Sequence, residues 1–468
     1  MKKTLALLLC SAFLPSLASA AMNGQILNCD TPNPTYPSNC VDNWALDLLD
    51  ESKSAIEAAK AAGSKLPRDR KHYFNGDGTG VHIFILDTGV FDANPEFKKL
   101  DAPTVSRIGA KYREDLMWDR DGGTHGTRVA GIAAGVKFGI AKDAIVHPII
   151  SNGDIGLDQY DGPALLHRLD WVRQQFEAGA KPAVLNMSFN IPTAGLAPGS
   201  IEDNNRLALT AKVNELIALG VVVVVSAGNH NGSPLNYWPS QIPAAIVVGG
   251  VDDYGRRWIR DEELGLCTSP PPGKQGDCGS NHGAVDLWAP ARRIRSAVQP
   301  QFNTAPLIRS GTSYAAPIVT GLAALYLETN PTATPAAVLS ALQGNAANLG
   351  NIDGDGDVDY LVRSPVATPA CNVPQRLFTN GGTATIPATA VKFSTVDLQD
   401  SCPSGTTASS PTMPAHGQLS IAGIAPEGVL YLYTPSGTYT GPDAFNYTIT
   451  PSTHGTGTVK VIVQPPVN

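Results

Sequence analysis

Three short segments carry the residue types that nucleophilic hydrolysis needs. Asp87 ends an apolar run and opens the turn D-T-G, His125 begins the string H-G-T-R-V-A-G, and Ser313 lies in G-T-S-Y-A-A-P. A serine hydroxyl becomes a nucleophile when an imidazole takes its proton and a carboxylate orients that imidazole. Taken alone, Asp87 is better explained as a turn former, and Ser313 as a helix N-cap. Together, the three residues predict a catalytic triad for acyl transfer.

Asn229 is a fourth residue suited to this chemistry. It follows the apolar run 221–225 in the string S-A-G-N, and an amide at a strand end can donate a hydrogen bond to an oxyanion. Ser313 precedes the apolar helical run 318–327, which places it at a helix N-terminus, where free N–H groups favour developing negative charge. The sequence therefore predicts an oxyanion site between these two residues. The alternative for Asn229 is an ordinary loop asparagine.

Two other hydrolase classes share parts of these strings. Aspartic proteases also carry D-T-G, but they need two such carboxylates, and the chain has no second D-T-G or D-S-G. An α/β-hydrolase needs G-x-S-x-G with its histidine last in the chain. The string G-T-S-Y-A around Ser313 lacks the final glycine, and no suitable acid and histidine follow it.

Alternating apolar and helical patterns must position these residues. Continuous apolar runs are typical of strands buried on both faces of a parallel sheet, and helical spacing separates them at 165–176 and 207–217. We therefore predict an α/β fold, a three-layer, doubly wound, mostly parallel sheet. The carboxyl ends of its strands form a crevice, which brings Asp87 and Asn229 to one edge. The expected strands are 81–86, 144–150, 183–187, 221–225 and 245–248.

The order Asp, His, Ser and the three strings resemble the subtilisin-like serine proteases (peptidase S8 family), with most likeness to the proteinase K-like branch, over roughly residues 40–350. The resemblance implies a secreted serine endopeptidase that acts on proteins or peptides through an acyl-enzyme, with no cofactor for catalysis. Ser313 would attack the scissile carbonyl, His125 would transfer the proton, and Asp87 would orient the imidazole. Asn229 and the Ser313 backbone N–H would stabilise the oxyanion.

The resemblance also implies a cleft in which an extended peptide pairs as an added strand. Three positions depart from the family: Asn190 replaces a usual glycine, Tyr314 a usual methionine, and Ile318 a usual histidine. Because position 190 lines the cleft, Asn190 is expected to narrow a subsite, and substrate preference stays open. The expected cleft residues are Ser188, Phe189, Asn190, Ser226, Ala227 and Gly228.

The N-terminus has the pattern of a secretory signal. Lys2 and Lys3 precede an apolar run that ends before A-S-A, so residues 1–20 are predicted to be a signal peptide, too short to span a bilayer. Residues from Trp44 onward already resemble the start of the catalytic domain. Residues 21–43 are therefore predicted to be an irregular leader and not the domain-sized propeptide that many family members carry.

The charge and the cysteines limit the partners and the compartment. The net charge of the 468-residue chain is −7 at pH 7, which gives no basic footprint for nucleic acid. Beyond Cys10, six cysteines remain in three close pairs, which suggests disulfides in an exported protein. Sequence alone does not fix the connectivity, and the neighbour pairing is Cys29 with Cys40, Cys267 with Cys278 and Cys371 with Cys402.

The composition changes after the peptidase domain, which we place at 44–363. A linker at 364–370 leads into short alternating runs rich in Thr, Pro and Gly, which predict a small β-sandwich at 371–468. This part resembles bacterial Ig-like or cadherin-like modules, and the resemblance implies a module that contacts a surface or a partner. Two alternative functions follow: a catalytically silent relative that binds peptides, or an adhesin that acts through this module.

The string N-I-D-G-D-G-D-V-D-Y-L-V at 351–362 resembles a calcium loop of the EF-hand or dockerin kind. A structural calcium would take Asn351, Asp353, Asp355 and Asp359 as ligands, but Val362 stands where the twelfth position needs a carboxylate. The alternative is an acidic, glycine-rich surface turn.

Overall fold

The structure is a computed structural model of the chain. It describes residues 23–27, 43–69, 71–112, 125–151, 162–260, 278–298, 308–364, 374–385, 387–395, 398, 402, 406–409, 411–425, 428–450 and 455–465.

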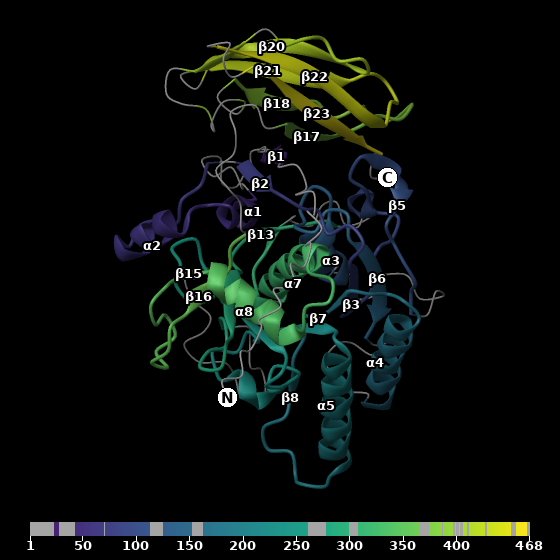
Figure 1. The fold of residues 1–468 in the computed structure, drawn as a ribbon, viewed down its shortest axis with the longest axis vertical. Helices are drawn as coiled ribbons and strands as arrows, with labels where there is room; N and C mark the ends of the chain where they lie inside the picture. Colours follow the sequence, from purple (N-terminus) through teal and green to yellow (C-terminus); the bar gives the residue numbers. More distant parts are fainter. Residues whose placement is uncertain are drawn as a thin grey trace, which may run out of the picture.

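A parallel sheet forms the centre of the larger part of the molecule (Figure 1). Its strand order is β15-β16-β12-β11-β9-β7-β3-β6, and every neighbouring pair is parallel except β15 with β16. Each of the five predicted runs forms a strand. The strands are β3 (His82–Asp87), β6 (Ile145–Ile150), β7 (Ala183–Met187), β9 (Val222–Ser226), β11 (Ile246–Val251), β12 (Leu287–Pro290), β15 (Ala347–Asn348) and β16 (Tyr360–Leu361).

Helices cover both faces of this sheet, which confirms the predicted three-layer α/β class. Consecutive strand residues point to opposite faces, so Ile83 and Ile85 pack with the helices of one layer while Phe84 and Leu86 pack with those of the other. The first layer contains α1 (Trp44–Leu49), α3 (His125–Ala134), α7 (Thr312–Thr329) and α8 (Pro335–Asn345), and the second contains α4 (Gly162–Glu177) and α5 (Ile201–Leu219).

Shorter elements connect the layers or lie at their edges. Helix α2 begins after Ser52, whose hydroxyl accepts a hydrogen bond from the Ala55 N–H and so caps the helix. The short elements are α2 (Lys53–Ala61), η1 (Pro95–Phe97), β4 (Lys98–Lys99), β5 (Ala102–Ser106), β8 (Ile191–Pro192), η3 (Pro234–Asn236), β10 (Tyr237–Trp238), β13 (Ile294–Arg295) and β14 (Ile308–Arg309).

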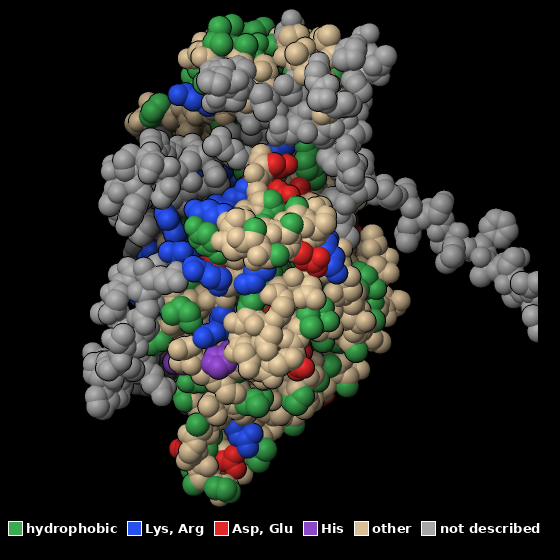
Figure 2. Space-filling model, turned by 90° about the vertical axis from the view of Figure 1, so that its left-hand side faces the viewer, with side chains coloured by type: hydrophobic (Ala, Val, Ile, Leu, Met, Phe, Trp, Pro, Cys, Tyr) green, Lys and Arg blue, Asp and Glu red, His purple; other side chains and the backbone are tan. Residues whose placement is uncertain are grey.

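The C-terminal module is a β-sandwich, as predicted. One sheet has the order β19-β22-β23-β17, the other β18-β21-β20, and alternate residues of β22 point into a shared core. Large hydrophobic side chains also lie on its surface (Figure 2), with Met413 at 65%, Ile421 at 66% and Ile424 at 86% exposure. Its strands are β17 (Gln375–Asn380), β18 (Val391–Ser394), β19 (Thr407–Ser409), β20 (Gly417–Ala425), β21 (Gly428–Pro435), β22 (Gly441–Thr450) and β23 (Thr456–Gln464).

Part of the leader is a strand, which corrects the expectation of an irregular segment. Strand β1 (Asn23–Ile26) pairs in parallel with β17 of the module and antiparallel with β2 (Lys71–Phe74) of the larger part. One sheet therefore runs across both parts of the molecule, with the leader strand between them (Figure 1). The pairing satisfies the backbone groups of an otherwise open edge of β17.

Side chains reinforce this junction. A small apolar cluster joins residues from both sides, and Arg376 of β17 forms an ion pair of 2.5 Å with Asp101. Arg376 is 3% exposed, so its charge is desolvated, and the Asp101 carboxylate compensates it. The apolar cluster contains Phe74, Leu100, Val136, Phe378 and Ile462.

Candidate active site

Asp87 and His125 meet at the carboxyl end of the central sheet. Asp87, the last residue of β3, is fully buried, and its Oδ1 lies 2.7 Å from His125 Nδ1. The Thr88 N–H also donates to this oxygen at 2.8 Å. The His125 side chain keeps 19% exposure, so the carboxylate lies behind the ring while the ring edge reaches solvent.

The small residues after His125 permit this approach. A Cβ on Gly126 would lie 2.1 Å from the Gly89 carbonyl oxygen, so only glycine lets the start of α3 pack on the D-T-G turn. The Gly126 N–H donates to the Thr88 hydroxyl at 2.9 Å, and the Phe91 N–H donates to the Thr127 hydroxyl at 2.9 Å. The strings D-T-G and H-G-T therefore bind each other, which explains why both contain threonine and glycine.

Ser313 is the second residue of helix α7. Its hydroxyl donates to the Ser188 carbonyl at 3.1 Å, and the ring of the next residue, Tyr314, packs against the His125 ring with centroids 5.5 Å apart. The structure thus brings Ser313 next to the end of β7 and brings the residue after it into contact with the imidazole. Pro317 is the sixth residue of this helix, which begins at Thr312.

Asn229 lies across from Ser313 with its amide orientation fixed. Its Oδ1 accepts from the Thr312 N–H at 2.9 Å and from the Thr312 hydroxyl at 2.8 Å. Because the oxygen is bound twice, the NH₂ group is directed away from Thr312 and remains a donor. The first N–H groups of a helix have no partner within it, so the Ser313 N–H is a second donor beside Asn229.

The two predicted cleft segments both contact the start of helix α7. Ser188, Phe189 and Asn190 follow β7, and Ser226, Ala227 and Gly228 end β9 and lead to Asn229. Ser188, Phe189, Ser226, Ala227 and Gly228 are buried, and Asn190 is half-buried. Contact of these six residues with a substrate stays a prediction.

Sequence reasoning missed the residues that fix these groups in place. Thr312 orients Asn229, and it stands in the G-T-S string, so the signal was present. Thr320 of α7 donates to Asn186 at 2.9 Å, and Asn186 in turn donates to the Ser188 hydroxyl at 2.9 Å. No local pattern predicts the bond between Thr320 and Asn186, because these two residues lie 134 apart in the sequence.

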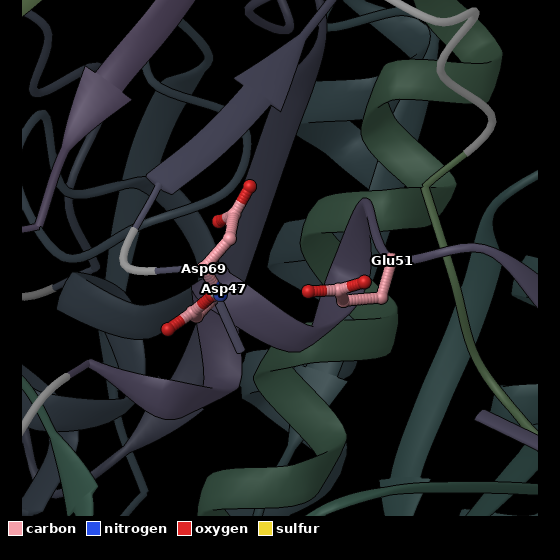
Figure 3. Close-up of side chains that lie close together, drawn as sticks. All are labelled: Asp47, Glu51 and Asp69. Carbon is pink, nitrogen blue, oxygen red and sulfur yellow. The ribbon is translucent and has the colours of Figure 1, made fainter. Parts of the chain in front are cut away.

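Three carboxylates outside the catalytic edge lie close together (Figure 3). Asp47, Glu51 and Asp69 each bring one oxygen within 4.8 Å of the others, with Asp47 buried and Asp69 exposed. Burial and repulsion by Asp69 raise the pKa of Asp47 well above its usual value, and the same two causes raise the pKa of Glu51 to about 7. Carboxylate oxygens are the ligands that Ca²⁺ prefers, so these are the described residues best suited to a divalent cation.

The predicted calcium loop has a different arrangement. Asp353, Asp355 and Asp359 do not form a close group of this kind. Asp355 accepts from the Asp357 N–H at 2.9 Å, and Asp359 is buried and accepts from the Ile352 N–H and the Trp288 indole. Calcium binding at this loop, with Asn351, stays a prediction.

The predicted cysteine pairs lie only partly within the described residues, and the predicted signal peptide lies outside them. Cys278 is a free, buried cysteine, which disagrees with its predicted pairing with Cys267. Cys29, Cys40, Cys267 and Cys371 lie outside the described residues, as does the predicted signal peptide. Among the residues that the structure does describe, no helix has both the length and the apolar character to cross a bilayer.

Comparison with known proteins agrees with this arrangement. Residues 78–364 match the subtilase family and residues 363–464 match the bacterial Ig domain. The chain is 34% identical over 304 residues to an extracellular serine proteinase of Thermus sp. (strain Rt41A) and 28% identical over 322 residues to alkaline serine exoprotease A of Vibrio alginolyticus. These alignments cover 64% and 69% of this chain but only 60% and 50% of the relatives.

A solved structure has the same fold. The crystal structure of a cold adapted subtilisin-like serine proteinase is 28% identical and superposes with a TM-score of 0.51, covering 69% of this chain and 98% of that one. The carboxyl edge of this doubly wound α/β sheet carries an aspartate, a histidine and a serine at a helix start. This combination of fold and residues defines a class of serine hydrolases. The chain belongs to the subtilase family within that class and carries a bacterial Ig domain after it.

Proposed function

We propose that the protein is a secreted serine endopeptidase that hydrolyses peptide bonds of proteins or peptides. The observation that carries the proposal is the 2.7 Å contact between Asp87 and His125 beside the helix N-terminus that bears Ser313. A buried carboxylate on Nδ1 leaves Nε2 as the base, and a serine at a helix start has backbone donors next to it. The names of the two curated relatives support the same reaction class.

In this proposal each group has one task. Ser313 attacks the scissile carbonyl, and His125 takes its proton and returns it to the leaving amine. Asp87 fixes the tautomer of His125 and stabilises the imidazolium. The Asn229 amide and the Ser313 N–H bind the oxyanion of the tetrahedral intermediate. Removal of one such donor in subtilisin lowers kcat by about 10²–10³. The Ser313 proton, which here faces Ser188, must face His125 in the reactive state.

The rest of the chain has supporting roles in the same proposal. The substrate lies extended along Ser188–Asn190 and Ser226–Gly228, residues 1–20 direct export, and catalysis needs no cofactor. The peptidase domain is 44–363, the linker 364–370 and the Ig-like module 371–468. A contact of the module with a surface or partner is compatible with Ile421 and Ile424, which are exposed on β20.

The test compares the wild type with Ser313→Ala on a peptide library and by labelling with a fluorophosphonate. We expect the wild type to label and to cleave, and Ser313→Ala to do neither, with kcat/KM lower by at least about 10³. Ser54→Ala, at an exposed serine of α2, is the matched control and should behave as the wild type. A well-folded wild type that neither labels nor cleaves would instead support the silent relative, and surface binding that survives Ser313→Ala in that same protein would support the adhesin.

A further inference from the structure

The Asn190 side chain connects the two predicted cleft segments, 188–190 and 226–228. The Asn190 NH₂ group, at the end of β7, donates to the Ser226 carbonyl at 3.1 Å and lies 3.2 Å from the Ser240 hydroxyl. The Ser226 hydroxyl donates to Asn190 Oδ1 at 3.3 Å. A Cβ on Gly228 would lie 3.2 Å from the same oxygen. The carboxamide therefore fills the gap between the segment after β7 and the end of β9.

This gap opens beside the nucleophile. Ser188, two residues before Asn190, accepts the hydrogen bond from the Ser313 hydroxyl. Asn229, one residue after Gly228, is bound to Thr312 at the start of the same helix. A peptide whose scissile carbonyl lies on Ser313 therefore directs the side chain just before that bond, the P1 side chain, between the two segments.

The walls of the gap are rigid. Strands β8 and β10 pair Ile191 with Trp238, so the residue after Asn190 is fixed to the segment that leads to Ser240. Trp238 is 1% exposed. At the other side of that segment Tyr237 stacks on His230 with ring centroids 4.5 Å apart. A large P1 side chain thus cannot gain room by moving the walls and must displace Asn190.

Displacement of Asn190 has an energetic cost. Ser226 is fully buried, so its carbonyl and hydroxyl would lose their polar partner on this side. A small P1 side chain needs no displacement and leaves these hydrogen bonds intact. Only a large P1 side chain therefore binds at the cost of these hydrogen bonds.

Resting on the proposed peptidase function, we infer that Asn190 closes the P1 pocket and restricts cleavage to bonds that follow small residues, namely glycine, alanine or serine. Asn190 is thus a specificity-determining residue. A glycine at this position would leave the gap open to aromatic and long aliphatic side chains.

The experiment measures kcat/KM on succinyl-Ala-Ala-Pro-X-p-nitroanilides with X as Ala, Leu or Phe, for the wild type, Asn190→Gly and Asn190→Ser. We expect the wild type to prefer Ala, and Asn190→Gly to raise the Phe-to-Ala ratio of kcat/KM by about tenfold or more. Asn190→Ser, which retains one polar group near Ser226, should lie between them. Asn231→Gly is the control, because Asn231 contacts Arg257 outside the gap and has a φ of 52°, which glycine accepts; its ratio should not change.

Two results would overturn the inference. One is a wild type that cleaves after Phe or Leu as well as after Ala. The other is an Asn190→Gly variant whose ratio equals that of the wild type. If Asn190→Gly does not fold, the wild-type preference and Asn190→Ser still decide the question. Failure of the proposed function looks different: the wild type would hydrolyse none of the three substrates.

Discussion

Thr320 of α7 donates a hydrogen bond to Asn186 of β7 at 2.9 Å, and both side chains are fully buried. The bond joins helix α7, which bears Ser313, to strand β7. Asn186 also donates to the Ser188 hydroxyl, and the Ser188 carbonyl accepts from Ser313. These hydrogen bonds therefore help to fix the position of Ser313 relative to the end of β7.

Thr320→Val should weaken both stability and catalysis. Valine has nearly the shape of threonine but leaves Asn186 Oδ1 without its donor, at a cost of about 1–3 kcal/mol in the free energy of unfolding. Because the helix can then shift relative to β7, kcat should fall more than KM rises. Thermal melting and steady-state kinetics check this, and Thr329→Val, at the exposed end of the same helix, is the control. A Thr320→Val variant that melts and turns over like the wild type would contradict the role of this bond.

Asn229→Asp should distinguish two roles of Asn229: its hydrogen bonds with Thr312 and its donation to the oxyanion. The carboxylate can still accept both hydrogen bonds from Thr312, so the local fold is preserved. It has no donor and adds a negative charge where the oxyanion develops, so kcat should fall by about 10²–10³ or more with a small change in KM. Kinetics on one peptide substrate measure the split. If KM rose instead while kcat stayed, Asn229 would be a binding residue only.

The sequence predicted the elements whose signals are local. The runs that became β3, β7 and β9 are mostly apolar because both faces of the sheet are buried. The short strings around Asp87, His125 and Ser313 lie at the ends of secondary-structure elements. The bond between Asn190 and Ser226 could not be predicted, because it joins residues 36 apart whose approach depends on the sheet order. Strand β1 was missed for the same reason: its four residues pair with β17, about 350 residues further along.

The junction between the two parts gives a stability prediction. Phe378 of the module is 3% exposed and packs in the apolar cluster with Phe74 of β2. Phe378→Ala, made in a Ser313→Ala background to prevent self-digestion, should cost about 3 kcal/mol and lower the Tm by about 5 °C. It should also make the module easier to release by added trypsin. Ile424→Ala, at a side chain 86% exposed, is the control and should change neither property. Equal Tm values for the two variants would mean that the module does not stabilise the peptidase domain.

A histidine pair between β3 and β6 predicts a loss of stability in acid. His147 Nε2 lies 2.8 Å from His82 Nδ1, and His147 Nδ1 lies 3.0 Å from the Ala110 carbonyl, so the neutral His147 ring accepts from one neighbour and donates to the other. Burial, and then the nearby His82, lower the pKa of His147 to about 4 from 6.5. The unfolded chain therefore binds more protons between pH 6.5 and 4, and stability is highest above pH 6.5 and falls as the pH decreases through this window, by up to about 3 kcal/mol.

His147→Gln should flatten this pH dependence, because the amide does not titrate. In the Ser313→Ala background, the difference in Tm between pH 7 and pH 4.5 should be smaller for His147→Gln than for its parent. His167→Gln replaces an exposed histidine of α4 and should keep the full difference. Melting curves at half-unit pH steps give the comparison. Because β3 ends in Asp87, we expect protonation of His147 to disturb the position of Asp87 as well. If the Tm of His147→Gln depended on pH as that of its parent does, other groups would be responsible for the acid sensitivity.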